Sequence, residues 1–138
     1  MNILSILKPA YNIPEITFNI QTSTLVISGN SFPESAEVVF KPVSDWFALY
    51  VLNPMPVTTV VFSLEYFNTP SSLYFLDILF RLKKLNETNQ VFVKWYLSEN
   101  DEVLLEAGET YREIVNIPFE IIEMQNMPYK NVSEIVAP

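Results

Sequence analysis

The hydrophobic pattern is clearest between residues 57 and 85, where its period changes from that of a strand to that of a helix. Four apolar residues alternate with their neighbours and predict a strand with one fully apolar face: Val60, Phe62, Leu64 and Tyr66. A polar turn follows, and apolar residues then recur at helical spacing as far as Leu85. Thr69 is predicted as the N-cap and Pro70 as the first helical residue, where a missing N–H costs nothing. The segment therefore predicts a strand, a tight turn and a long helix.

The rest of the chain continues this alternation of strands and helices. The pattern predicts a hairpin of strands at about 15–20 and 24–28, a helix over 35–52, a strand at 91–97, a helix over 98–114 and a strand at 118–124. Pro42 is expected to kink the first helix or to divide it in two. Residues 1–13 are interpreted as a lead-in that is partly ordered at best. Residues 125–138 have no clear period and are interpreted as a tail or as a contact in a homodimer.

This order of elements predicts an α/β fold with right-handed crossovers. The expected sheet has about five strands, mostly parallel, with the N-terminal hairpin as an antiparallel edge. A chain of 138 residues suits one domain with its own core, here about residues 9–124.

Three strand-to-helix loops are expected to meet at one edge of the sheet, because ligands of open α/β sheets bind beyond the carboxyl ends of parallel strands. The loops are residues 29–34, 68–72 and 98–101. Their convergence places Thr69 next to Ser31, Glu34 and an acidic run. Gly29 is one of only two glycines, so we expect it to hold a backbone conformation that other residues resist.

Charge and composition narrow the functional classes. The net charge of −8 disfavours nucleic acid or an anionic membrane as a partner, since both attract clustered Lys and Arg. No apolar run approaches the roughly 20 residues needed to span a bilayer. The N-terminus lacks the basic region and cleavage site of a signal peptide, so we expect a cytoplasmic protein.

The chain has no cysteine and no histidine. Disulfides, thiolate nucleophiles, Cys/His zinc sites and Ser-His-Asp triads are thereby excluded. The acidic residues between 99 and 123 match no EF-hand spacing and are interpreted as a solvated helix face, so we expect no metal and no cofactor. Carboxylate, lysine or tyrosine chemistry remains open to an enzyme, but a binding or regulatory domain is favoured.

The turn itself holds the main candidate residues. Thr69 is either an ordinary N-cap or an acceptor for phosphate, which gains contacts with free backbone N–H groups at a helix start. Ser71 and Ser72 compete as acceptors but fall inside the first helical turn. Glu65 is either a solvated carboxylate or a group that orients Asn68 or Thr69.

The helix after Pro70 has two apolar stripes. The first is expected to face the sheet: Phe75, Leu76, Leu79 and Leu82. The second, Tyr74, Ile78 and Leu85, either packs under a neighbouring helix or the tail, or forms part of a partner-binding face beside Arg81. Asp77 and Arg81 are spaced for an ion pair on the wet side.

Several phrases of the chain together resemble the SiaC family of bacterial regulatory phosphoproteins. They are G-x-SFPE at 29–34, LEYFNT-x-SS at 64–72, and WY at 95–96 leading into Asp101 and GE at 108–109. The resemblance covers roughly residues 9–124. It implies a fold like that of STAS (anti-sigma factor antagonist) domains.

The resemblance also implies partner switching in cyclic di-GMP signalling. A cognate kinase would phosphorylate Thr69, a PPM-type phosphatase would remove the phosphate, and the unphosphorylated form would bind an output partner such as a diguanylate cyclase. Pro70 departs from the family, in which a small polar residue is common, but leaves the acceptor hydroxyl in place. Taken together with the loop convergence and the second stripe, the candidate switch-loop and partner-binding residues are Ser31, Phe32, Glu34, Glu65, Asn68, Ser71, Ser72, Tyr74, Ile78 and Arg81.

Two other functions are kept as hypotheses. One is a small-molecule-binding domain whose pocket at the same loop edge is lined by Ser31, Glu65, Trp95 and Tyr96. The other, an enzyme that uses carboxylates, is the least favoured because no evident nucleophile–base pair is present.

Overall fold

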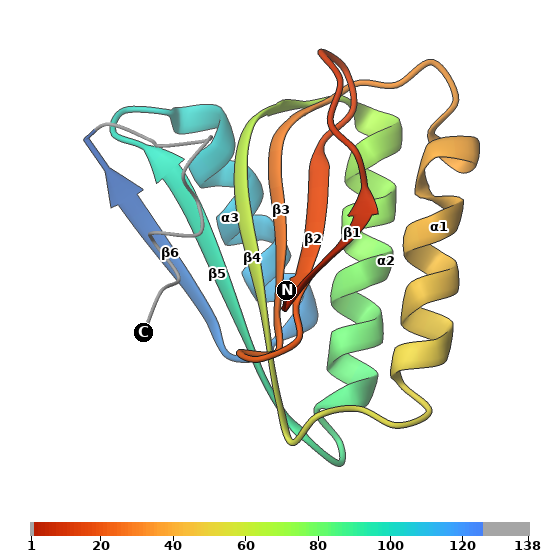
Figure 1. Cartoon of the computed structure of the whole chain (residues 1–138). Helices are drawn as coiled ribbons and strands as arrows, with labels where there is room; N and C mark the ends of the chain where they lie inside the picture. The colour runs from red at the N-terminus through yellow and green to blue at the C-terminus, as the bar shows by residue number, and fades with distance from the viewer. Residues whose placement is uncertain (1, 126–138) are drawn as a thin grey trace.

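The computed structural model describes residues 2–125 and shows a six-stranded sheet and three helices in that range (Figure 1). The elements are β1 Ile3–Leu7, β2 Glu15–Asn19, β3 Thr24–Ser31, α1 Ala36–Tyr50, β4 Val57–Phe67, α2 Thr69–Leu85, β5 Gln90–Ser98, α3 Glu102–Val115 and β6 Phe119–Met124. The predicted tail at 125–138 lies almost wholly outside the described residues. Within the described part of the chain, no helix is long and apolar enough to cross a membrane.

The strands lie side by side in the order in which they occur along the chain. β1, β2 and β3 pair antiparallel, whereas β3, β4, β5 and β6 pair parallel, with one helix between each parallel pair. This confirms the predicted mixed sheet with an antiparallel edge. The sixth strand, β1, lies in the lead-in that we expected to be partly ordered. Its sequence, ILSIL, does not alternate between apolar and polar residues, and its pairing with β2 defines it as a strand.

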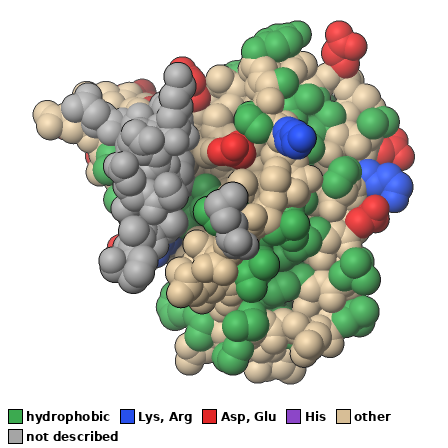
Figure 2. All heavy atoms as spheres, in the orientation of Figure 1, with side chains coloured by type: hydrophobic (Ala, Val, Ile, Leu, Met, Phe, Trp, Pro, Cys, Tyr) green, Lys and Arg blue, Asp and Glu red, His purple; other side chains and the backbone are tan. Residues whose placement is uncertain are grey.

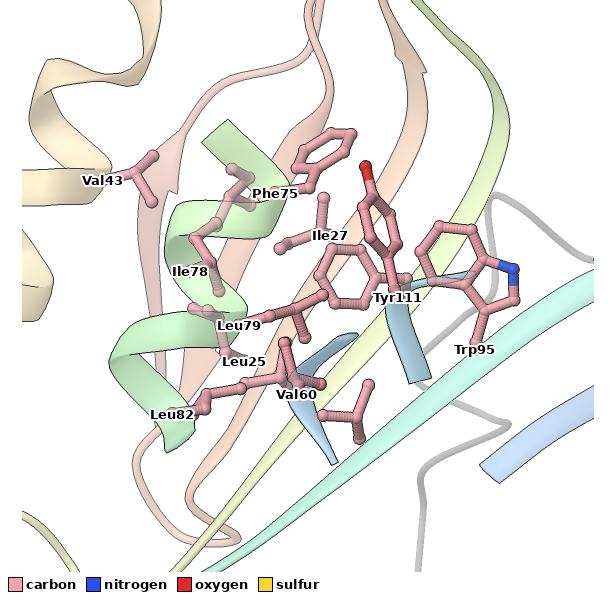
Figure 3. Close-up of a cluster of buried hydrophobic side chains, with 14 of the residues drawn as sticks. Leu25, Ile27, Val43, Val60, Phe75, Ile78, Leu79, Leu82, Trp95 and Tyr111 are labelled. Atoms are coloured by element: carbon pink, nitrogen blue, oxygen red, sulfur yellow. The ribbon is translucent and has the colours of Figure 1, made fainter. Parts of the chain in front are cut away.

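All three helices share one hydrophobic core with one face of the sheet. Figure 3 shows the rings of Phe75, Tyr111 and Trp95 beside aliphatic side chains of this core. The Trp95 ring lies 5.1 Å from that of Phe62 and 5.6 Å from that of Tyr111, measured between centroids. The predicted stripe of α2 faces this core, since Phe75, Leu79 and Leu82 are fully buried. On the molecular face shown in Figure 2, charged side chains are few, and hydrophobic and neutral ones cover most of the surface that the structure describes.

Helix α1 runs past Pro42 as one helix, so of the two alternatives, a kink or a division, the division is wrong. Pro42 lies on the exposed side of the helix. Val38, whose carbonyl loses its helical partner, is 71% exposed, so water can take the missing hydrogen bond.

The apolar face of β4 shifts by one residue near its end. Tyr66, predicted to point into the core, is 54% exposed, and Phe67 instead packs on Phe75 and Trp95. The cause is a bulge in the pairing with β3: Gly29 pairs with Leu64 but the next residue pairs with Tyr66, leaving Glu65 as an extra residue. Gly29 has φ of +97°, which confirms its predicted special backbone conformation.

Helix α3 lies close to the sheet because of the second glycine. A Cβ atom on Gly108 would come within 2.7 Å of two atoms of the Trp95 indole. The indole Nε1 donates a hydrogen bond of 2.9 Å to the carbonyl of Leu104, which fixes the helix over the ring. Gly108 therefore does not interrupt the helix but lets it approach Trp95.

We expect Gly108→Ala to lower the free energy of unfolding by up to about 2 kcal/mol, because overpacking costs about 1–3 kcal/mol and alanine regains roughly 1 kcal/mol in a helix. Urea denaturation followed by tryptophan fluorescence measures the change. Glu109→Ala, on the exposed side of α3, is the control and should stay within about 0.5 kcal/mol of the unmodified chain. A variant more stable than the unmodified chain would show that Trp95 gives way freely.

Candidate functional site

The loops after β3, β4 and β5 lie at one edge of the sheet, as predicted, because these three strands are parallel. The backbone N–H of Asn68 donates to the carbonyl of Ser31 over 2.9 Å, which joins the first two loops. Thr69 of the second loop and Asp101 of the third loop line the same pocket, so the third loop also lies at this site. Glu34 is exposed in the loop before α1, and among residues 2–125 no hydrogen bond links it to Thr69.

Asn68, not Thr69, is the N-cap of α2. The Asn68 side-chain oxygen accepts from the backbone N–H of Ser71 over 3.0 Å, while Thr69 is the first helical residue and Pro70 the second. The predicted cap is wrong by one residue because β4 ends at Phe67 and the chain enters the helix earlier. Asparagine is as good a cap as threonine. The Thr69 side chain is thus not needed for capping, and the residue is exposed.

The other two hydroxyls of the turn are engaged. Ser71 is fully buried, and its Oγ lies 2.7 Å from the Oγ of Ser31 and donates to the Ser31 carbonyl over 3.1 Å. Ser72 is half-buried, and its hydroxyl donates to the carbonyl of Thr69 over 2.6 Å. Of the three candidate acceptors, Thr69 is therefore the exposed one.

A pocket of about 510 Å³ opens beside Thr69, between the end of β4 and the start of α3. Its lining residues are Glu65, Tyr66, Phe67, Asn68, Thr69, Ser72, Asp101, Val103, Leu104 and Ala107. Two of these are carboxylates and none is a lysine or arginine. Asp101 also caps α3, since its Oδ1 accepts from the Leu104 N–H over 3.1 Å.

Three of the four residues predicted to line this pocket lie elsewhere, and only Glu65 lines it. Ser31 is fully buried in its contact with Ser71. Trp95 is buried beneath α3. Tyr96 belongs to a separate small cluster with Val61, because successive residues of β5 point to opposite faces of the sheet.

The second stripe of α2 packs under a neighbouring helix, which was one of the two alternatives. Ile78 is only 3% exposed, and the Tyr74 ring stacks on that of Phe40 in α1 at 5.0 Å. Ile78 is therefore not available on the surface as a partner-binding residue. The Arg81 guanidinium pairs with Asp77 over 2.9 Å as predicted, but lies roughly 18 Å along the helix from Thr69.

Sequence reasoning missed an exposed aromatic row at this edge. The Phe32 ring lies between those of Tyr11 and Tyr66, with centroids 5.9 and 5.8 Å away, both edge to face. Tyr11 fell in the lead-in and Tyr66 was assigned to the core. The one sequence feature that could have found the row is Glu65, a charged residue that interrupts an apolar strand.

The fold and site define a small α/β domain with an exposed threonine at the rim of a loop-edge pocket. No group of three carboxylates suited to a metal ion occurs within residues 2–125. The chain belongs to the SiaC family of regulatory phosphoproteins, whose family model matches residues 7–124. This confirms the resemblance of the sequence phrases.

Known relatives and structures agree with this assignment. An uncharacterised protein of Pseudomonas aeruginosa is 28% identical over 109 residues, covering 78% of this chain and 86% of its own. The crystal structure of apo-SiaC from the same organism is 26% identical and superposes with a TM-score of 0.77, covering 88% of this chain and 99% of SiaC. SiaC in complex with the diguanylate cyclase SiaD, of which it is the activator, is also 26% identical, with a TM-score of 0.79 over 84% of this chain and 96% of SiaC.

The capping geometry predicts that neighbouring substitutions differ in cost. Asn68→Ala should lower the free energy of unfolding by about 1 kcal/mol, because the Ser71 N–H loses its acceptor. Thr69→Ala removes no capping bond and should cost about 0.5 kcal/mol or less. Urea denaturation compares the two variants directly. A larger loss for Thr69→Ala would assign the cap to Thr69.

The burial of Tyr111 predicts that the free energy of unfolding falls in alkali. Burial raises the pKa of Tyr111 from 10.0 to about 12, and its hydroxyl donates to the Ser72 carbonyl over 2.9 Å. Because the unfolded chain loses this proton first, the associated stability is complete below pH 10.0 and is lost as the pH rises toward about 12. Denaturation across this range should show a shallower decline for Tyr111→Phe. The decline should persist in Tyr11→Phe, which alters a tyrosine that is 81% exposed.

Proposed function

We propose that this chain is a non-enzymatic cytoplasmic switch whose choice of partner is set by phosphorylation of Thr69. A cognate kinase adds the phosphate, a PPM-type phosphatase removes it, and the unphosphorylated form binds an output protein such as a diguanylate cyclase. The observation that carries the proposal is that Thr69 is exposed at the pocket rim while Ser71 and Ser72 are engaged. Membership of a family of regulatory phosphoproteins supports it.

The phosphate would change the site strongly. It adds about −1.5 to −2 charge next to the carboxylates of Glu65 and Asp101, which line the same pocket. A partner docked over the pocket would have to desolvate that charge against apolar walls. A coupling of about 1–3 kcal/mol, usual for such regulation, corresponds to a change in affinity of about 5- to 150-fold.

The docking surface is smaller than the sequence suggested. Ile78 is buried and Arg81 lies toward the other end of α2, so neither belongs to it. The surface that includes Thr69 consists of the pocket and the residues around its rim. The relative SiaC, solved in complex with the cyclase that it activates, supports a protein as the output partner.

A second candidate, small-molecule binding, is favoured by the pocket volume of about 510 Å³, which is large enough for a metabolite. Thermal unfolding in the presence of nucleotides and organic acids tests it. A ligand that raises the melting temperature of the unmodified chain but not of Ala107→Trp, which fills the pocket, would support this reading. A third candidate function is an enzyme. It would require a catalytic activity of the purified chain that disappears in Glu65→Gln.

We expect phosphate on Thr69 alone after co-expression with candidate kinases from the same genome, because Thr69 is the exposed hydroxyl of the turn. Intact mass and site mapping measure it. Thr69→Ala should abolish the modification, whereas Ser72→Ala, the control, should keep it. Pull-downs of the two forms should recover different partners. Phosphate found only on another residue, or equal recovery of every partner, would contradict the proposal.

A further inference from the structure

We propose that the partner of the unphosphorylated form presents a cationic apolar segment, in which one apolar side chain enters the Thr69 pocket and a neighbouring arginine lies across Tyr66. This inference rests on the proposed function and adds the chemistry of the partner. Three observations carry it: an exposed aromatic row, acidic side chains without a basic residue in the pocket, and an apolar wall that is open to solvent.

The aromatic row is Tyr11, Phe32 and Tyr66. Tyr11 is 81% exposed and Tyr66 54% exposed, and Phe32, half-buried between them, holds both rings edge to face. Exposed tyrosines held rigid by a neighbouring ring bind partners with little loss of conformational freedom. Their faces favour a guanidinium group. Tyr66 also lines the pocket, so the row and the pocket form one continuous surface.

The charges around this surface favour a cation. Glu65 and Asp101 line the pocket, Glu34 is exposed two residues after Phe32, and Glu102 is exposed in the first turn of α3. The basic residues of α2 lie in its last two turns, at the opposite end from Thr69: Arg81, Lys83 and Lys84. A site lined by carboxylates in a chain of net charge −8 attracts cations and repels acidic partners.

The apolar wall explains why the partner needs more than charge. The apolar residues that line the pocket are Phe67, Val103, Leu104 and Ala107. Val103, in the first turn of α3, is 78% exposed. A leucine or phenylalanine from a partner would remove this surface from water, which is favourable. A neighbouring arginine on the partner would contact both the Glu65 carboxylate and the Tyr66 ring, since these are consecutive residues at the rim.

A cationic partner changes how the phosphate on Thr69 acts. The phosphate attracts the arginine instead of repelling it, but this attraction is screened over about 8 Å at physiological salt. The same phosphate occupies the pocket rim and must lose hydrating water if an apolar side chain enters, which is unfavourable. Exclusion from the pocket, not repulsion, therefore lowers the affinity. Added salt should weaken binding to the unmodified chain and should not restore binding to the phosphorylated form.

The test selects short random peptides from a phage-displayed library on the full chain and measures the affinity of synthetic versions by fluorescence anisotropy. We expect enrichment of arginine next to leucine, isoleucine or phenylalanine. Replacing that arginine by citrulline, which is neutral and of equal size, should weaken binding about tenfold, as for the loss of one cation–π contact with a nearby carboxylate. Glu65→Gln and Tyr66→Ala should each weaken binding about fivefold or more.

Matched controls separate this surface from general charge and stickiness. Phe92→Ala removes an exposed aromatic ring of β5, and Glu113→Gln removes an exposed carboxylate of α3. Both should change the affinity about twofold or less. Circular dichroism confirms that each variant is folded. Val103→Ser should weaken the peptides without altering their preference for arginine over citrulline.

Several results would overturn the inference: no selected peptide, selected peptides that are neutral or acidic, equal affinity for arginine and citrulline forms, or no effect of Glu65→Gln and Tyr66→Ala. A second experiment, in which phosphothreonine is incorporated at position 69 during translation, distinguishes failure of this inference from failure of the proposed function. A phosphorylated form that binds the cationic peptide as well as the unmodified chain does would refute the switch and leave the docking surface. Phosphate-dependent partner exchange with no cationic preference would refute only this inference.

Discussion

The whole site depends on a hydrogen-bond cluster around Ser31 at the end of β3. Its carbonyl accepts from the Asn68 N–H and the Ser71 hydroxyl, and its own hydroxyl is paired with that of Ser71. Ser31 and Ser71 are fully buried, so an unpaired group there would cost about 1–3 kcal/mol. Because each bond crosses from β3 to the start of α2, the cluster fixes where the helix begins and which residue of the turn faces water.

The two glycines have one function each in shaping the site. Gly29 takes a backbone conformation with φ of +97° next to the bulge that makes Glu65 an extra residue. Without that bulge, the alternation of β4 would point Tyr66 into the core and Phe67 outward. Gly108 lets α3 lie against the Trp95 indole, which positions the wall formed by Val103 and Ala107. The two constraints differ: at Gly29 it is the positive φ, since a Cβ there would meet no other atom within 4 Å, and at Gly108 it is the contact with Trp95.

The sequence was sufficient for the architecture but not for positions that depend on one-residue shifts. Periods of two and 3.6 identified five strands and three helices, because each of these elements carries a regular apolar pattern, and the order of the elements then located the loop edge. The cap at Asn68, the exposure of Tyr66 and the strand β1 depend on pairing between distant segments, which a local pattern does not contain. Ile78 was ambiguous for a related reason, since only the placement of α1 decides whether a second apolar stripe is covered.

Residues other than Thr69 make the hydrogen bonds that hold the start of α2, so Thr69 could be modified and restored without unfolding the helix. If Thr69 were the cap, a phosphate on its hydroxyl would displace a bond that holds the first turn. Asn68 supplies that bond instead, and Ser71 supplies the bond to the sheet, so the helix start is complete without the Thr69 side chain.

Pro70 adds stiffness at a position where no N–H is required. A phosphate at the first helical residue would lie near the positive end of the helix dipole, which offsets part of its repulsion from Glu65 and Asp101. In the proposed switch, the turn would therefore hold either form of Thr69 with the same backbone, and the two forms would differ at the surface that a partner contacts.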